Sequence, residues 1–337
     1  MKGPIVCDIS GTVLTEADRR RIAHPLVGMV ILFSRNYENR RQLRNLCDAI
    51  HDVKPEILIG VDHEGGRVQR FRNEFTQIPA MSLYGKAFAK DKAKALASLE
   101  EAAFVLVAEL RECGTDFTFA PVLDLNWNRS TIIGERSFSR DPKDVALMAR
   151  AVCTGFARAG VANCAKHFPG HGYASADSHV SLPVDERSAE EILLNDVEPY
   201  RELLGVLKSI MTAHVLYPAL DGVPATFSKK IITDILRKKI GFDGLLFSDD
   251  LSMQGAKGEG GILQRAEKAF SAGCDAIIVC NAPESVDVLL ENLVWKETSQ
   301  FLQRASLICP KGKLWHFGEL QDCDEYKNAL SRMQDGL

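Results

Sequence analysis

The chain lacks several features that would assign it to a special class of protein. In 337 residues, no apolar run approaches the roughly 18 residues that a membrane-spanning helix needs. A formal net charge of −4 leaves no basic surplus for binding nucleic acid or an anionic membrane. No tract of low complexity and no internal repeat is evident. We therefore predict a protein with no nucleic-acid partner and no membrane partner.

The cysteines form no recognisable framework. There are nine, scattered from Cys7 to Cys323, and no two of them make a CxxC pair. Several lie beside apolar strand-like runs, where a free thiol packs as a small hydrophobe. We also expect no secretory signal, because Asp8 interrupts the first apolar run. These features predict a reduced, cytoplasmic protein without disulfides or a cysteine zinc site.

Short apolar runs alternate with helix-like segments along most of the chain. The predicted strands are Ile5–Ile9, Val27–Phe33, Ile57–Val61, Phe117–Pro121, Ala162–Lys166, Ile210–Ala213, Leu245–Phe247 and Ala276–Val279. The predicted helices are Arg40–Ile50, Leu99–Glu112, Pro142–Ala159, Ala189–Val206, Lys229–Ile240 and Leu263–Ala272, with C-terminal helices around Glu284–Ser306 and Glu325–Gln334. Strands that are apolar on both faces and separated by helices are typical of a parallel sheet covered on both sides.

The number of strands favours a (β/α)8 barrel of the TIM type, for which about 250 residues is usual. The remaining length then forms long βα loops and extra C-terminal helices from about residue 285. A doubly wound open sheet is the structural alternative. We expect residues 1–337 to form one barrel domain, and we expect a monomer because no apolar stripe suggests an obligate interface.

The segment 166–172, with sequence KHFPGHG, is the most informative stretch. His167, His171 and His179 fall within thirteen residues, and the proline and glycines between them exclude a regular helix. Histidine is the side chain that titrates near physiological pH. A histidine cluster on a loop directly after an apolar strand predicts a catalytic loop, the alternative being a loop with surface histidines.

Polar and ionisable residues gather where the predicted strands end. Active sites of such barrels lie at the carboxyl ends of the strands. The side chains at or just after these ends include Asp62, His63, Glu64, Asp124, Lys166, His167, His214, Asp249 and Asp250. Their collection at one rim indicates an enzyme.

Two pairs of residues at this rim suit acid–base or nucleophilic chemistry. Asp249 and Asp250 follow an apolar run, where a carboxylate can attack an anomeric carbon, accept a proton or bind a metal. A helix-capping role is the alternative, and we expect one role for each residue without assigning which. Asp177 is spaced so that its carboxylate can orient the imidazole of His179, although an exposed turn explains the spacing equally well.

The remaining candidates are charged or metal-binding residues near the same strands. Arg70 and Arg136 follow the third and fourth strands and suit contacts to the hydroxyls or carboxylates of a substrate, or are ordinary surface charges. The spacing of His167 and His171 is that of paired zinc ligands, but Pro169 and Gly170 between them exclude a shared helical face. We predict no metal ion and no cofactor.

These motifs together resemble the family 3 glycoside hydrolases, and within them the cytoplasmic bacterial β-N-acetylglucosaminidases of peptidoglycan recycling. The resemblance covers most of residues 5–285. The motifs that carry it are GVD (60–62), GERSF (134–138), KHFPGHG (166–172), DSH (177–179), MTAH (211–214), SDDLSM (248–253) and AGCD (272–275).

The resemblance implies a role for each matching residue. Asp249 is implied as the nucleophile, His179 as the general acid/base and Asp177 as the residue that orients it. The implied sugar-binding residues of the −1 subsite are Asp62, Arg70, Arg136, Lys166 and His167. Beyond the resemblance, residues 309–337 carry no motif, and we expect Trp315 and Phe317 to be packing anchors.

The implied reaction is removal of terminal GlcNAc from small peptidoglycan fragments, GlcNAc-1,6-anhydroMurNAc and its peptides, through a covalent glycosyl-enzyme. A histidine would replace the usual acid/base carboxylic acid, and its ordinary pKa near 6.5 suits proton donation at neutral pH. The alternatives are attack by the substrate's own acetamido group, a β-glucosidase or β-xylosidase, a phosphorylase, a non-catalytic sugar-binding barrel and a metal-dependent hydrolase.

Overall fold

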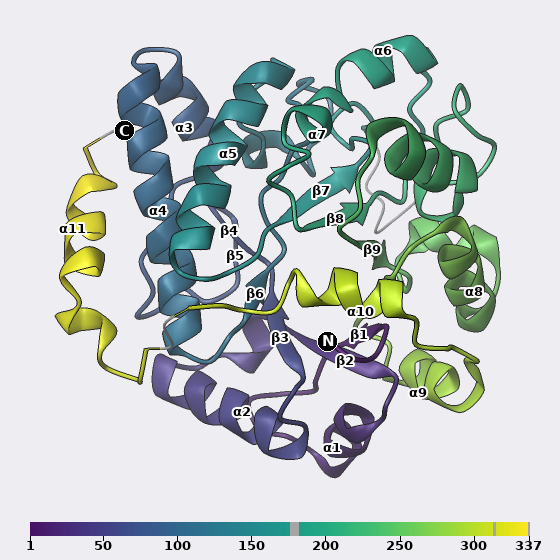
Figure 1. Cartoon of the computed structure of the whole chain (residues 1–337), viewed down its shortest axis with the longest axis horizontal. Helices are drawn as coiled ribbons and strands as arrows, with labels where there is room; N and C mark the ends of the chain where they lie inside the picture. The colour runs from purple at the N-terminus through teal and green to yellow at the C-terminus, as the bar shows by residue number, and fades with distance from the viewer. Residues whose placement is uncertain (176–181, 313–314, 336–337) are drawn as a thin grey trace.

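The computed structural model, which describes residues 1–175, 182–312 and 315–335, contains an eight-stranded parallel sheet curled into a (β/α)8 barrel (Figure 1). The strands are β1 (Ile5–Cys7), β2 (Val27–Leu32), β3 (Leu58–Val61), β6 (Phe117–Thr118), β7 (Cys164–Phe168), β8 (Ser209–Thr212), β9 (Leu245–Asp250) and β10 (Ala276–Val279). Their order around the sheet is β6-β3-β2-β1-β10-β9-β8-β7. A parallel bridge between Val122 and Lys166 joins the two outer strands and closes the barrel.

All eight predicted strands are confirmed, although seven of them differ from the prediction by one to three residues at one or both ends. β6 stops at Thr118 because Pro121 has no N–H to donate to a ladder. β7 and β9 each continue past the predicted end, to Phe168 and Asp250. These two extensions place His167, Asp249 and Asp250 within the strands, although the pairing of β7 with β8 is irregular between Ala165 and Phe168.

Helices surround the sheet in the order expected of a barrel (Figure 1). They are α1 (Glu16–Ala23), α2 (Arg40–Val53), α3 (Met81–Phe88), α4 (Lys92–Glu112), α5 (Pro142–Arg158), α6 (Ala189–Leu194), α7 (Glu198–Glu202), the π-helix η4 (Lys230–Ile240), α8 (Ile262–Ala272), α9 (Pro283–Asn292), α10 (Ser299–Ser306) and α11 (Asp324–Arg332). Short 3₁₀ turns and a small hairpin, β4 (His63–Gly65) with β5 (Val68–Gln69), occupy the loops.

Two helix predictions were wrong in extent. The single helix predicted over residues 189–206 is two helices, α6 and α7, because Pro199 in the first turn of α7 has no N–H for a continuous helix. α4 begins at Lys92, seven residues before the predicted start, where the side chain of Asp91 accepts the N–H of Lys94 and caps the helix.

The core has two layers, one inside the barrel and one between the sheet and the helices. Inside, Phe117, Phe119 and Phe247 pack with ring centroids 5.1–6.0 Å apart. Phe301 on α10 and Ile308 after it join this inner layer. They pack near Leu58 and Leu245, which lie at the amino ends of β3 and β9, so α10 covers that end of the barrel. The opposite rim, at the carboxyl ends, is left for a site.

The C-terminal segment, residues 315–335, packs on the outside of the barrel against α4. Trp315 is buried with its ring edge-on to Phe104 of α4, and the Arg41 guanidinium lies 4.0 Å from the centre of the Phe317 ring. Both residues are the packing anchors that the sequence predicts. None of the helices that the structure describes is both long enough and apolar enough to cross a bilayer.

Candidate active site

A pocket of about 440 Å³ opens at the carboxyl ends of the strands. Six of the eight residues predicted for the site line it: Asp62, Arg70, Arg136, Lys166, His167 and Asp249. They come from β7, β9 and the loops after β3 and β6, so the barrel brings together residues that lie up to 187 positions apart in the sequence (Asp62 to Asp249). The other two, Asp177 and His179, lie outside the described residues.

A buried network of opposite charges forms one wall of the pocket. The Lys166 ammonium lies 2.8 Å from Oδ1 of Asp62 and 2.7 Å from Oε1 of Glu64. The Arg136 guanidinium donates two hydrogen bonds, of 2.8 and 2.7 Å, to the two carboxylate oxygens of Glu64. Two cations thus balance two anions, which is the condition under which buried charges are tolerated.

The network keeps its carboxylates ionised. Burial opposes ionisation of Glu64, but Arg136 and Lys166 outweigh it and hold the pKa of that carboxyl well below its usual range. For Asp62, burial is likewise outweighed by Lys166 and Arg70, and its pKa is lowered. The two carboxylates in turn raise the pKa of Lys166 above its usual value despite burial. The wall therefore keeps its charges at neutral pH.

Arg70 is held more loosely than the other cations. Its guanidinium lies 3.6 Å from Oδ2 of Asp62, and a third of the side chain is exposed. Its Nε is buried and has no hydrogen-bond partner among the residues that the structure describes. The exposed part of the guanidinium lines the pocket and can donate to a ligand oxygen.

His167 is oriented by a buried carboxylate. Its Nδ1 lies 2.7 Å from Oδ2 of Asp124, which leaves Nε2 for the pocket. The other oxygen of Asp124 accepts the backbone N–H groups of His167 and His171 at 3.2 and 2.7 Å. Burial raises the pKa of Asp124, but the contact with His167 outweighs it and the pKa is lowered. A carboxylate that fixes one ring nitrogen sets the ring's orientation.

The two adjacent acids at the end of β9 have different surroundings. The Asp250 carboxylate accepts hydrogen bonds from the N–H and hydroxyl of Ser252, at 2.9 and 2.7 Å, and from the N–H of Cys280 at 3.1 Å. Burial raises its pKa to about 6. Asp250 therefore has the structural role that we expected of one member of the pair. It holds a turn and not a helix N-terminus, because residues 251–253 do not continue as a helix.

Asp249 is the member of the pair that lines the pocket. Its Oδ1 accepts the backbone N–H of Asp250 at 2.8 Å. Behind it, His214 is buried, stacks on the ring of Phe227, and places Nε2 3.0 Å from the carbonyl oxygen of Asp250. Burial lowers the pKa of His214, so this histidine is neutral and supports the strand end.

Two of the histidines at predicted strand ends lie outside the pocket. His63 is buried between the rings of Phe71 and Phe75, with centroid distances of 5.8 and 5.7 Å, and burial lowers its pKa to about 3. Neither His63 nor His214 lines the pocket. A side chain at a strand end can pack against the helices or face the pocket. The position of a residue in the sequence does not distinguish these two cases.

Glu64 and Asp124 are the site residues to which the sequence assigned no role. Both stand at strand ends, and that position was the available signal. Their partners Arg136 and His167 are 72 and 43 residues away. Pairings of that separation are decided by the closure of the barrel, so spacing along the chain does not reveal them.

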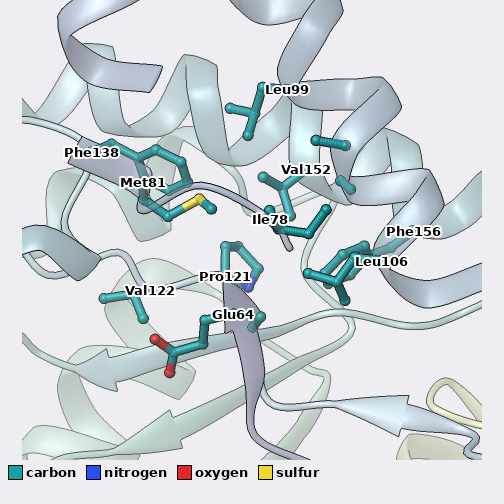
Figure 2. A pocket seen from close by; sticks show the side chains of 13 residues that line it. Glu64, Ile78, Met81, Leu99, Leu106, Pro121, Val122, Phe138, Val152 and Phe156 are labelled. Carbon is teal, nitrogen blue, oxygen red and sulfur yellow. The ribbon is translucent and has the colours of Figure 1, made fainter. Parts of the chain in front are cut away.

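A second, apolar cavity lies behind Glu64 (Figure 2). Its volume of about 20 Å³ is room for about one water molecule, so it is no sugar site. Figure 2 shows side chains such as Met81, Leu99 and Phe156 around it, with the Glu64 carboxylate turned away from them. This apolar backing excludes water from one side of the Glu64 ion pairs.

The loops that flank residues 176–181 are joined by one arginine. Arg187 is buried, lies 2.6 Å from Asp185 and 2.8 Å from Asp196, and its guanidinium stands 4.4 and 4.3 Å from the rings of Trp127 and Tyr173. Tyr173 precedes the segment and Asp185 follows it. The chain on both sides of that segment is thus tied to the loop after β6.

The residues described include no group of three or more His, Cys, Asp or Glu side chains arranged to hold a metal ion. His167 and His171, the pair with zinc-like spacing, have ring centroids 5.9 Å apart at an angle of 71°. Asp124 already occupies Nδ1 of His167.

We predict that Glu64→Gln destabilises the fold by about 3 kcal/mol at pH 7, because it leaves Arg136 and Lys166 buried with one anion fewer. Since the folded pKa of Glu64 is depressed, its contribution is present above the unfolded pKa near 4.3. It is lost as the pH falls below that value, by about 1.4 kcal/mol per pH unit. Urea unfolding of the wild type and of Glu64→Gln, at pH values from 7 down to below about 4.3, measures how the difference between their unfolding free energies shrinks.

Asp234→Asn is the matched control for this variant. It removes an exposed ion pair of the same length, 2.8 Å to Lys238, for which about 1 kcal/mol or less is expected. A loss of the same small size in Glu64→Gln would contradict the structural role of the buried network.

Comparison with known proteins agrees with the fold. Residues 9–305 match the glycosyl hydrolase family 3 N-terminal domain. The chain is 48% identical over 330 residues to a β-hexosaminidase of Bordetella avium, covering 97% of this chain and 94% of the relative. A β-hexosaminidase of Chromobacterium violaceum is also 48% identical, over 93% of this chain and 88% of its own length.

Solved structures give the same result. NagZ from Neisseria gonorrhoeae in complex with N-trifluoroacetyl-D-glucosamine is 40% identical, with a TM-score of 0.93 over 98% of this chain and 97% of that one. A family 3 β-N-acetylglucosaminidase from Paenibacillus is 30% identical, with a TM-score of 0.86 over 99% of this chain and 67% of that one. The chain belongs to glycosyl hydrolase family 3 and is a glycoside hydrolase of the β-N-acetylhexosaminidase type.

Proposed function

We propose that the enzyme removes terminal non-reducing GlcNAc from small peptidoglycan fragments, GlcNAc-1,6-anhydroMurNAc and its peptides, with retention of configuration. The observation that carries the mechanism is the division of labour at the end of β9. Asp250 is bonded to the turn, while Asp249 faces a pocket lined with polar and charged groups. The names of the relatives, β-hexosaminidase and β-N-acetylglucosaminidase, support the choice of sugar.

The charged wall suits a sugar with several hydroxyls. Asp62 can accept from hydroxyl groups, while Lys166 and Nε2 of His167 face the same pocket. The partly exposed guanidinium of Arg70 lines the pocket and can donate to a further oxygen. We propose that these four residues, together with Arg136, contact the sugar directly in the −1 subsite.

We propose that Arg136 holds Glu64 in addition to making the sugar contact that the resemblance implies. Two of its N–H groups donate to Glu64 and one to the carbonyl of Ile132, at 3.2 Å, so two of the five guanidinium N–H groups remain at the pocket that Arg136 lines. By holding Glu64, which in turn holds Lys166, Arg136 also supports the other contacts.

The proposed reaction is a double displacement. Asp249 attacks the anomeric carbon while His179 donates a proton to the leaving oxygen, and a glycosyl-enzyme forms. In the second step His179 takes a proton from water, which attacks the same carbon and releases Asp249. Asp177 would orient His179 as Asp124 orients His167. The roles of Asp177 and His179 rest on the sequence motif.

The remaining expectations from the sequence are part of the same proposal. They are a single barrel domain, a monomeric state and a cytoplasmic location, where small muropeptide fragments would be the substrates. No resident metal ion or cofactor has a step in the proposed reaction.

A panel of 4-nitrophenyl β-glycosides, measured without added metal, tests the substrate. We expect turnover of the N-acetylglucosaminide, little of the glucoside, xyloside and N-acetylgalactosaminide, and a loss of at least about 10³-fold in Asp249→Ala. Preferred turnover of the glucoside would contradict the proposed sugar while keeping the fold and nucleophile. Full activity of Asp249→Ala would contradict the nucleophile.

A 5-fluoro glycosyl fluoride of GlcNAc tests how the anomeric carbon is attacked. We expect a covalent adduct on Asp249, located by mass spectrometry of a peptic digest, because the fluorine slows release of the intermediate more than its formation. An active enzyme that forms no adduct under these conditions would favour attack by the substrate's own acetamido group.

The leaving group tests His179. We expect His179→Ala to lose 10²-fold or more with poor leaving groups such as a sugar alcohol, and much less with a nitrophenolate, which needs little protonation. Measuring kcat/KM across aryl glycosides of rising leaving-group pKa gives this dependence. Unchanged turnover of the substrates with poor leaving groups would contradict the acid/base role.

A further inference from the structure

The C-terminal segment lies outside the part of the chain that matches the family domain, which ends at residue 305. In the structure, α11 lies along the outer side of α4 (Figure 1). Two buried glutamates near the end of α4, Glu109 and Glu112, are in contact with this segment. Each glutamate also contacts a residue outside this segment, Thr76 for Glu109 and Arg40 for Glu112.

Glu109 joins α11 to a loop of the active site. One carboxylate oxygen, Oε1, accepts the Tyr326 hydroxyl at 2.5 Å and the Thr76 hydroxyl at 2.7 Å. The other, Oε2, accepts the backbone N–H of Thr76 at 2.9 Å. Because Glu109 and Tyr326 are both buried, these bonds are exchanged poorly with water and hold Thr76 in one position.

Thr76 in turn is bonded to the residue next to Arg70. The Gln69 side-chain amide donates to the carbonyl of Thr76 at 3.0 Å and accepts the N–H of Ile78 at 3.1 Å. Gln69 is the last residue of β5, and the Arg70 that follows it lies beside Asp62 in the pocket. A continuous set of hydrogen bonds and one peptide bond therefore connects Tyr326 to Arg70.

Glu112 holds the same loop from its other side. It accepts the N–H groups of Gly318 and Leu320 at 3.0 and 2.9 Å, and it pairs with Arg40. Arg40 lies over the ring of Phe75, with 5.1 Å to its centre. Two parts of the C-terminal segment, residues 318–320 and Tyr326, are thus connected to the loop that returns from Arg70, the first through Glu112 and Arg40 and the second through Glu109.

We propose that Tyr326 is a positioning residue for substrate binding, acting through Glu109, Thr76 and Gln69 on Arg70. The inference rests on the proposed function, in which Arg70 contacts the sugar. Loss of the Tyr326 hydroxyl leaves the buried Glu109 carboxylate one donor short, so Glu109 and Thr76 shift to regain a partner. Arg70, loosely held at 3.6 Å from Asp62, follows that shift.

The test is Tyr326→Phe, which removes the hydroxyl and keeps the ring. We expect KM for 4-nitrophenyl N-acetyl-β-glucosaminide to rise about 5-fold with kcat nearly unchanged, because a binding contact present in both ground and transition states is weakened. Ser98→Ala is the matched control. Its hydroxyl donates to the carbonyl of Met333 at 2.6 Å, a buried contact of the same α4 face with the C-terminal segment that has no link to Thr76.

The control separates positioning from simple loosening of the C-terminal segment. We expect both variants to lower the Tm by a few degrees and only Tyr326→Phe to raise KM. An equal rise of KM in Ser98→Ala, or an unchanged KM in Tyr326→Phe, would overturn the inference. Failure of the wild-type enzyme to hydrolyse the glycoside would instead overturn the proposed function.

A double-mutant cycle with Arg70→Lys tests the route. If the effect of Tyr326 passes through Arg70, the rise in KM from Tyr326→Phe shrinks to less than about 2-fold in the Arg70→Lys background. If the rise in KM of the double variant equals the product of the rises in the two single variants, the effect of Tyr326 does not pass through Arg70 and the route is wrong. Should Tyr326→Phe fail to fold, Thr76→Val removes the other hydroxyl donor to the same oxygen of Glu109 and provides the same measurement.

Discussion

The charge balance around Lys166 is the constraint on which the site depends. Its ammonium is buried between Asp62 and Glu64, and Arg136 completes the set. None of these charges is tolerable alone in the interior, and the four residues come from three parts of the barrel rim. The end of β7, the loop after β3 and the loop after β6 are therefore held in one arrangement, and the pocket wall exists before any sugar enters it.

The same rim contains two kinds of group: buried carboxylates that hold the backbone or a neighbouring side chain, and side chains that face the pocket. Asp250 gives its oxygens to Ser252 and Cys280, while Asp249 faces the pocket. Asp124 gives its oxygens to His167 and to two backbone N–H groups, which leaves one imidazole nitrogen exposed to ligand. In each case a buried carboxylate with several donors fixes its neighbour. Such preorganisation is how a site avoids reorganising its dipoles during reaction.

Much of the fold was predictable because its signals are local. Eight apolar runs between amphipathic segments predict a barrel, and all eight are strands. The failures were local as well: Pro199 divides a predicted helix, and the Asp91 cap starts α4 earlier than its apolar pattern does. The site was predictable as a rim, since strand ends meet in a parallel barrel. His63 shows the limit, because a strand-end residue can face the helices as well as the pocket.

The sequence by itself determined the barrel, the family and the residues at its catalytic rim, because strand periodicity and short motifs are properties of neighbouring residues. Only the tertiary structure decided which acid holds the turn, that Glu64 and Asp124 complete the site, and that Tyr326 is bonded to an active-site loop. These last contacts join residues 43 to 217 positions apart (Asp124 with His167, Glu109 with Tyr326). Such pairs meet only once the barrel has closed, and burial then makes each unpaired charge or donor costly enough to select its partner.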